Sequence, residues 1–485
     1  MNHTPEGWHA FAMKDLLKKL KRHKPELIIA GIKVVTYLGL FLLFFSLMGV
    51  NNWQLRHLSR TTAITFVTYI AMSCVMNSVY GGFDVGRKKS KPVISSLVLS
   101  TLVVDTITYL ELQIMNVNAA NNNTLVLFGA DFLYLMLCMV LQCMLIVISV
   151  RIGNTTYFRF HPPRRCLLIV RTPEERNILM RKISRYRLQW NVERSVLFDD
   201  PDLERHIKRA QVVFLGTLPP DVQMNILHTC YDMKRDVICK AQLEDIMLST
   251  SRQIIVDDAP FLAMEFYKMT LGQRIAKRLI DIAFSAMVLL VFSPIFLIIT
   301  VCILLEDGKP VIFRQKRLTI NGREFSICKF RTMTAKASQK KHQRSASAND
   351  ARITRTGKWL RRFRIDELPQ FWNILCGDMT IVGPRPEMLD NVRQYKMQLP
   401  AFAYREKMKA GLTGYAQIEG RYNTTPEDKV MLDLMYIESF SVWQDIKLIF
   451  RTLTVFFKSD STQGFDPAPV TSNNNHHDSG LAAGS

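Results

Sequence analysis

Four long apolar runs occupy most of the N-terminal third of the chain, and each approaches the length of a membrane-spanning helix. A helix needs about 20 residues to cross the hydrocarbon core of a bilayer. The pattern therefore predicts a membrane protein with a four-helix transmembrane bundle over residues 27–152, after a basic stretch over residues 1–26. The runs are Leu27–Val50, Thr61–Tyr80, Val93–Met115 and Thr124–Val150.

Four charged residues interrupt these runs: Lys33, Asp105, Glu111 and Asp131. Charged side chains are costly inside a bilayer and are rarely directed toward lipid. We interpret them as groups that face the bundle interior or reach toward the interface. The alternative is a transport pathway, which predicts that replacing Asp105 or Asp131 abolishes function.

Basic residues are distributed unevenly among the segments that connect the runs. Residues 14–24, 87–91 and 151–165 are rich in Lys and Arg, whereas residues 51–60 carry two arginines and residues 116–123 none. Lys and Arg concentrate in cytoplasmic loops of membrane proteins. We therefore expect a multi-pass membrane protein with both ends of the bundle in the cytoplasm.

Between residues 160 and 258 short apolar strands alternate with amphipathic helices, starting with the strand Cys166–Val170. Such alternation predicts a small parallel sheet covered by helices, a Rossmann-like α/β domain. A dinucleotide site of that fold needs a glycine-rich turn after the first strand. The turn here, Arg171–Glu175, has no glycine, so we expect a structural or regulatory domain without a bound cofactor.

A fifth apolar run, Phe284–Leu305, contains 22 residues without a charge. Basic residues flank it on both sides, which places both flanks in the cytoplasm. Pro294 lacks an N–H and clashes with the carbonyl of Leu290, so the helix should break at Ser293-Pro294, where the Ser293 hydroxyl can serve a freed backbone group. We expect a re-entrant membrane helix over residues 279–305; an ordinary kinked spanning helix is the alternative.

The overall charge narrows the choice of partners. The chain has 63 Lys and Arg against 42 Asp and Glu, a formal charge of +21, and 48% of its residues are hydrophobic. A positive surplus points to anionic partners, and the long apolar runs favour lipid and phosphate-bearing substrates over nucleic acid. The nine Cys form no CxxC pair, so neither a zinc site nor a disulfide framework is expected.

Residues Arg314–Met333 are densely cationic around a predicted hairpin with its turn at Asn321-Gly322. Lys329 and Arg331 lie on its second strand, where they could line a groove for phosphates. A solvated basic face is the alternative. Residues 335–350, rich in Lys, Ser, Ala and Gln, are expected to form a mobile loop.

Asp366 and Glu367 precede Leu368-Pro369 and an apolar helix that ends near Gly377. Asp at an N-cap, Pro in the first turn and Gly after the end suit the two termini of a helix. A carboxylate at the N-cap should stay ionised in the positive end of the helix dipole. An ionised carboxylate among arginines can approach phosphorus with help from a divalent metal. A capped surface helix is the alternative.

Two further segments carry candidate binding residues. Gly383-Pro384-Arg385-Pro386 is a rigid turn that presents one arginine, suited to an anion or simply a structural turn. The stretch KAGLTGYAQIEGR is rich in glycine and contains Gln417 and Arg421. Residues 459–485, of Asn/His/Ser/Gly composition, are expected to be a disordered tail.

In this order the motifs resemble the bacterial sugar transferase family, the monotopic phosphoglycosyl transferases. The resemblance covers residues 270–458 and rests on FSPIFLI, CKFRTM, RIDELPQFWNILCGDMTIVGPRPE and GLTGYAQIEGR. It implies an α+β catalytic domain that transfers a hexose 1-phosphate from a UDP-sugar to undecaprenyl phosphate, with release of UMP, as the first membrane step of exopolysaccharide or O-antigen assembly.

The resemblance also implies roles for residues. Asp366 matches the nucleophile that forms a covalent phosphosugar intermediate, and Glu367, with Asp366, the site of Mg²⁺. The residues implied in substrate binding are Arg361, Lys329, Arg331, Pro384, Arg385, Pro386, Gln417 and Arg421. The resemblance to the large form of the family also implies a homodimer in the bacterial inner membrane, with the catalytic domain on the cytoplasmic face. A non-catalytic membrane scaffold of a polysaccharide assembly system is the alternative function.

Overall fold

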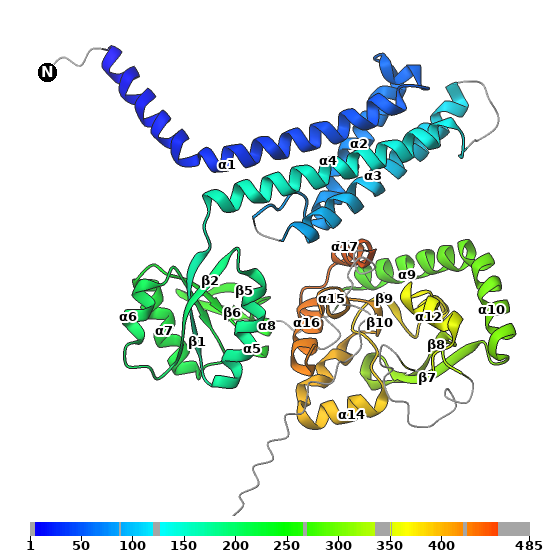
Figure 1. Ribbon diagram of the computed structural model, residues 1–485. Coiled ribbons are helices and arrows are strands. Elements are labelled where there is room, and N and C mark those ends of the chain that lie inside the picture. The colour runs from blue at the N-terminus through cyan, green and yellow to red at the C-terminus, as the bar shows by residue number, and fades with distance from the viewer. Residues whose placement is uncertain are drawn as a thin grey trace, which may run out of the picture. The chain divides into compact units, whose positions relative to one another are not determined.

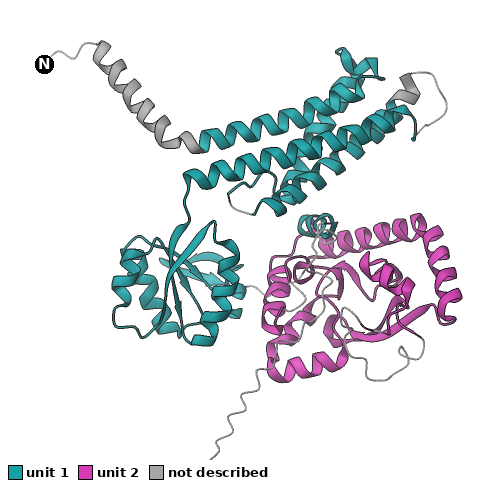
Figure 2. Ribbon diagram, viewed as in Figure 1, with its two compact units in different colours: residues 1–266, 443–457 teal, residues 267–442, 458–485 magenta. Residues whose placement is uncertain are grey.

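Figure 1 shows the computed structural model, which describes residues 5–86, 89–119, 127–264, 269–334, 350, 352–420 and 424–453. The chain divides into two compact units. Figure 2 colours them: residues 1–266 with 443–457 form the first unit, and residues 267–442 with 458–485 form the second. Each unit is described by itself below.

The first unit begins with long apolar helices that confirm the predicted runs. In the described part of the chain, four helices are long and apolar enough to cross a membrane, at Glu26–Met48, Arg60–Tyr80, Ser90–Met115 and Ala130–Phe160. The fourth starts six residues later than the run at Thr124 suggested and continues to Phe160. The helices and the short turn between the first two are α1 (Pro5–Met48), η1 (Trp53–Arg56), α2 (Arg60–Tyr80), α3 (Ser90–Ala119) and α4 (Ala130–Phe160).

The charged residues of the bundle are mostly turned inward, as the sequence predicted. Asp131 accepts hydrogen bonds from the side-chain amides of Asn51, Asn52 and Gln113. Asp105 is completely buried, and Glu111 accepts from the Thr68 hydroxyl at 2.9 Å. The hydrogen bonds of Asp131 and Glu111 fit structural polar contacts between helices.

After the bundle comes a four-stranded parallel sheet in the order β2-β1-β3-β4, as the alternation of strands and helices predicted. Residues of β1 alternate between two buried clusters, because successive side chains of a strand point to opposite faces. The elements are β1 (Arg164–Val170), α5 (Pro173–Ile183), η2 (Ser184–Tyr186), β2 (Trp190–Leu197), α6 (Leu203–Arg209), β3 (Val212–Leu215), α7 (Pro220–Asp232), β4 (Asp236–Cys239) and α8 (Leu243–Leu248).

An antiparallel hairpin that the sequence did not predict follows this sheet. It consists of β5 (Arg252–Val256) and β6 (Ala259–Ala263), which pair only with each other among the described strands. Its large apolar side chains are exposed, with Ile255 at 77% and Leu262 at 59%. An isolated hairpin has too little buried surface to be stable by itself.

The second unit begins with a bent pair of helices, α9 (Leu271–Val291) and α10 (Ser293–Asp307), whose axes differ by 60°. The break falls at Ser293-Pro294, as predicted. The Ser293 hydroxyl donates to the carbonyl oxygen of Leu290 at 2.8 Å, which confirms the expected role of this serine.

The rest of the second unit mixes short strands and helices. The predicted hairpin is confirmed, and Asn321 and Gly322 both have positive φ at its turn. Its strands and the later elements are β7 (Ile312–Leu318), η3 (Ile320–Gly322), β8 (Glu324–Phe330), α12 (Arg355–Arg362), η4 (Ile365–Glu367), α13 (Gln370–Cys376), β9 (Thr380–Val382), α14 (Leu389–Gln398), η5 (Pro400–Lys407), β10 (Gly411–Thr413), α15 (Tyr415–Ile418) and α16 (Pro426–Glu438). The last described helix, α17 (Val442–Thr452), groups almost entirely with the first unit.

Candidate active site

Asp366 and Glu367 lie in the 3₁₀ turn η4, and this corrects the predicted helix cap. The residue that caps α13 is Pro369, three residues after Asp366. The chain enters η4 through Arg364, which has φ 54° in the left-handed region. A non-glycine residue is strained there, so tertiary contacts rather than a local capping preference hold the carboxylates in place.

Glu367 is surrounded by positive charge. Its Oε1 atom lies 2.8 Å from Lys329 Nζ on β8 and 3.4 Å from Arg385 Nη2. Burial by itself would raise the pKa of the Glu367 carboxyl, but Lys329, Arg385 and Arg364 outweigh burial and hold this pKa well below its ordinary value. Glu367 is therefore ionised at every physiological pH.

Asp366 differs from its neighbour, although both are carboxylates of one turn. Burial, and then the negative charge of Glu367, raise the pKa of Asp366 to about 6, against the smaller opposing effects of Lys329 and Arg361. The predicted reason for its ionisation, the dipole of the following helix, does not apply, because Pro369 rather than Asp366 caps α13. A carboxylate that titrates near 6 is ionised at neutral pH and is more basic than an ordinary aspartate, as a nucleophile or base requires.

Two of the arginines predicted to bind substrate, Arg361 and Arg331, have different positions in the structure. Arg361, on α12, donates from Nε to the Thr332 hydroxyl at 2.8 Å and is close enough to influence the Asp366 carboxyl. Arg331 is buried and is directed to the end of α10, where its Nη2 donates to the carbonyl oxygens of Asp307 and Gly308. The structure therefore brings Arg361 to the dyad and uses Arg331 to anchor the bent helix pair.

The turn that carries Arg385 follows β9 directly and is packed closely against β10. The backbone N–H of Gly383 donates to Thr413 O at 2.8 Å, and that of Gly411 donates to Pro384 O at 2.9 Å. A Cβ at either glycine would overlap the facing backbone, so both positions require glycine. The turn leaves the Arg385 side chain 43% exposed beside Glu367, where a ligand phosphate can reach it.

Three cations from three elements hold this turn, and the sequence analysis assigned a role to none of them. Arg405 of η5 donates to Arg385 O at 2.9 Å, and Arg317 of β7 donates to Pro386 O at 3.4 Å. Lys429 of α16 pairs with Glu387 at 3.0 Å. No local motif marks these residues, because they are distant in sequence from the turn.

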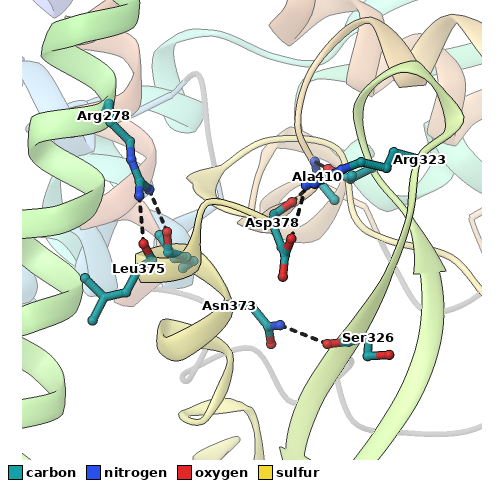
Figure 3. A network of polar contacts seen from close by, with 9 residues as sticks. Arg278, Arg323, Ser326, Asn373, Leu375, Asp378 and Ala410 are labelled. Carbon is teal, nitrogen blue, oxygen red and sulfur yellow. Dashed lines mark hydrogen bonds and ion pairs between the residues drawn. The ribbon is translucent and has the colours of Figure 1, made fainter.

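The helix that follows the dyad is fixed at two points, which Figure 3 shows. At its C-terminal end, Arg278 of α9 donates to the carbonyl oxygens of Ile374 and Leu375, both at 2.7 Å. Along its side, the Asn373 amide accepts from Cys328 N at 2.9 Å and donates to Ser326 O at 2.8 Å on β8. These contacts join α13 both to the apolar helix pair and to the strand that carries Lys329.

Of the remaining predicted residues, the structure describes Gln417, on α15. The side-chain amide of Gln417 is buried and has no hydrogen-bond partner among the described residues. It packs against Gly414, whose Cβ position would be 2.8 Å from Gln417 Oε1. Arg421, most of the predicted loop over residues 335–350 and the tail from residue 459 lie outside the described residues.

The donor set of the dyad suits one kind of metal. Among the described residues, no group of three or more His, Cys, Asp or Glu side chains gathers as a metal site. Mg²⁺ usually binds through one or two carboxylates together with substrate phosphates and water. Asp366 and Glu367 fit that pattern, so a magnesium ion that arrives with a diphosphate could be held here.

The chain is similar in sequence to known proteins. The family described as bacterial sugar transferase matches residues 272–459. The chain is 42% identical over 185 residues to UDP-glucose:undecaprenyl-phosphate glucose-1-phosphate transferase of Klebsiella pneumoniae, a match that covers 37% of this chain and 39% of that protein. It is 41% identical over 180 residues to UDP-N-acetylgalactosamine-undecaprenyl-phosphate N-acetylgalactosaminephosphotransferase of Aeromonas hydrophila, which covers 36% and 42%.

A third relative is matched over nearly its whole length. The chain is 36% identical over 189 residues to an uncharacterized sugar transferase of Bacillus subtilis, which covers 39% of this chain and 91% of that protein. By contrast, the matches span only about two fifths of the Klebsiella and Aeromonas proteins. The family match over residues 272–459 covers most of the second unit together with α17, and it includes the dyad and the Arg385 turn.

Proposed function

This chain belongs to the bacterial sugar transferase family, and from that premise we propose that it transfers a hexose 1-phosphate from a UDP-sugar to undecaprenyl phosphate. The products are undecaprenyl-diphosphate-sugar and UMP. The observation that carries the proposal is the pair of unlike carboxylates: Glu367 Oε1 lies 2.8 Å from Lys329 and 3.4 Å from Arg385, while burial raises the pKa of the neighbouring Asp366 to about 6. The names of the relatives support the same reaction class.

The proposed reaction has two displacements at one phosphorus atom. First, a carboxylate oxygen of Asp366 attacks the phosphorus that bears the sugar; a P–O bond to Asp366 forms, and the P–O bond to UMP breaks. Second, a phosphate oxygen of undecaprenyl phosphate attacks that phosphorus, and the bond to Asp366 breaks. The carboxylate is thereby regenerated, and no proton has to be removed from Asp366 above its pKa of about 6.

The surrounding cations would lower the charge repulsion between an anionic nucleophile and an anionic diphosphate. Arg385 and Arg361 can bind phosphate oxygens, and Lys329 holds Glu367 in place. Mg²⁺, held by Glu367 and Asp366, would neutralise part of the charge of the diphosphate. Fixed cations in a site of low dielectric constant stabilise developing charge more strongly than water does.

We also propose that α9 and α10 enter the cytoplasmic leaflet and return to the same side. Large apolar side chains are exposed on both helices, among them Leu290 at 76% and Leu305 at 83%. Both outer ends are anchored in the same unit: Lys277 donates to Val382 O at 2.9 Å, and Glu306 accepts from the backbone N–H of Arg355 at 2.7 Å. One compact unit cannot hold both ends of a helix that spans the bilayer.

The proposed orientation places the second unit on the cytoplasmic face of the inner membrane. A cysteine introduced near Gly308 should then be labelled only from the cytoplasm, and periplasmic labelling would refute re-entry. We further propose a homodimer. Its support is the exposed hairpin β5–β6, whose apolar residues Ile255 and Leu262 need a cover that a second copy can provide.

The test of the function is Mg²⁺-dependent release of UMP by the purified protein. UDP-glucose, UDP-galactose and N-acetylated UDP-sugars are each supplied with undecaprenyl phosphate, and the lipid product is identified by mass spectrometry. At least one sugar should be transferred. Folded protein that releases no UMP from any of them would contradict the proposal and favour a membrane scaffold.

A further inference from the structure

The turn that presents Arg385 is held by a buried ion pair. Arg405 Nε lies 2.5 Å from Asp433 Oδ2, and the two residues are only 6% and 1% exposed. They come from η5 and α16, and both elements follow the turn in the sequence. The second arm of the Arg405 guanidinium, Nη2, donates to Arg385 O at 2.9 Å.

This arrangement is unusual for a pair that serves stability alone. The desolvation of two charges offsets most of their attraction, and apolar residues of similar volume often replace a buried pair without loss of stability. The Asp433 carboxylate contacts the Nε edge of the planar Arg405 guanidinium, and the Phe402 ring lies over its face, with the ring centroid 4.6 Å from the guanidinium carbon. These two contacts orient the group so that its Nη2 atom reaches the Arg385 carbonyl oxygen.

From Arg385 the contacts continue to the carboxylate of the active site. Arg385 Nη2 reaches Glu367 Oε1 at 3.4 Å, and Lys329 reaches the same oxygen at 2.8 Å. A continuous series of hydrogen bonds thus joins Asp433, Arg405, Arg385 and Glu367. Displacing the Arg385 backbone would displace the guanidinium that faces Glu367.

We propose that Arg405 and Asp433 are positioning residues: through the Arg385 carbonyl they fix the Arg385 guanidinium where it binds the phosphates of a nucleoside diphosphate. The inference rests on the proposed function only in assigning that ligand. Neither side chain touches the ligand, and both act through Arg385. A displacement of about 1 Å in such a site can lower a rate by roughly 10²-fold.

The test is a double-mutant cycle between the pair and Arg385. The apolar replacement Arg405→Met with Asp433→Leu removes the bond to the turn and fills the space. In the wild-type background it should lower kcat/KM for UMP release about 10–100-fold and weaken binding of UDP, measured by calorimetry without turnover. In an Arg385→Ala background the same replacement should change both quantities less than about threefold, because its effect passes through Arg385.

A matched control is available in the Lys407–Glu438 pair, which joins the same two elements, η5 and α16, at 3.3 Å. Lys407→Met with Glu438→Leu should leave UMP release and UDP binding unchanged. Thermal unfolding shows whether the Arg405/Asp433 replacement is folded. If it is not, Arg405→Lys takes its place in the double-mutant cycle, because an ammonium group lacks the two separate N–H arms that bind Asp433 and the turn.

The two possible failures can be told apart. Equal losses with and without Arg385 would overturn the positioning role, even if the protein is a transferase. A wild-type protein that binds UDP with the expected coupling, but never releases UMP from a UDP-sugar, would leave the positioning role standing and refute the proposed function.

Discussion

The carboxyl ends of parallel strands carry a turn in each unit, and the two turns are built in opposite ways. After β1, the Glu175 carboxylate accepts the Thr217 N–H at 2.8 Å and lies 3.6 Å from Lys240 Nζ. The carboxylate therefore lies against Gly216 and Thr217 directly after β3, at the edge where parallel sheets commonly bind anionic ligands. After β9, Arg385 stands beside Glu367 and is open to solvent.

The difference shows that a turn after a parallel strand can either be neutralised by a carboxylate of the same chain or leave a cation exposed for an external anion. Burial by itself would raise the pKa of Glu175, but hydrogen bonds from Thr217 and Arg171 outweigh it and lower the pKa. The chain thus supplies its own anion in the first unit. In the second unit the cations around the turn, Arg385, Arg405, Arg317 and Lys429, outnumber the nearby anions, as the proposed binding of an external phosphate requires. The predictions below test this contrast.

The largest effect is expected for Asp366→Asn. The amide keeps the size of the side chain but removes the nucleophilic oxygen anion, so UMP release should fall by roughly 10³-fold or more. Release is measured with a UDP-sugar and undecaprenyl phosphate, alongside the unfolding temperature. Full turnover in a folded Asp366→Asn protein would exclude the covalent route.

Arg385→Ala should come next, with a loss of about 100-fold in kcat/KM, because a charge-assisted contact to phosphate is removed from a preorganised site. UDP binding should weaken in parallel. The matched variant in the first unit is Lys240→Ala, which removes a cation beside Glu175. It should leave UDP binding unaltered; weaker binding there would mean that the first unit also takes nucleotide.

A smaller effect is expected from pH. The Asp366 pKa of about 6 is raised above its ordinary value, so the carboxyl is protonated, and inactive as a nucleophile, below that pH. The kcat/KM for UMP release should therefore fall about tenfold per pH unit below 6 and level off above it.

The Lys329→Met variant sharpens this pH test. Lys329 lowers the pKa of Asp366, so removing its charge should move the inflection to higher pH. An inflection at an unchanged pH in both proteins would show that another group controls the profile.

The smallest effect is expected for Glu175→Gln. The amide can still accept from Thr217, but the charge is lost, so stability should decrease by about 1 kcal/mol with activity unchanged. Thermal unfolding and UMP release measure the two quantities. A large loss of activity would assign the middle sheet a part in the reaction.

The sequence predicted elements whose signal is local. The four apolar helices, the parallel sheet, the turn at Asn321-Gly322 and the break at Ser293-Pro294 each follow from hydrophobic periodicity or from the backbone preferences of Gly, Asn and Pro. The dyad was found through its motif. These features need no knowledge of residues elsewhere in the chain.

Features that depend on tertiary contacts were missed. The cap expected at Asp366 did not form, because Arg364 adopts a left-handed conformation and the chain turns as η4 before α13 begins. Arg317, Arg405 and Lys429 meet around the Arg385 turn only because the fold brings β7, η5 and α16 to it. In the sequence these three residues cannot be distinguished from ordinary surface Lys and Arg residues, because no local motif includes them.

The side chain of Asn373 has a consequence for the solubility of the second unit. Strand edges with unpaired backbone groups invite strands from other chains and so promote aggregation. The hairpin β7–β8 has only two strands, but the Asn373 amide offers β8 both an acceptor and a donor, as a neighbouring peptide group would. One amide thus closes this stretch of strand edge to a foreign chain.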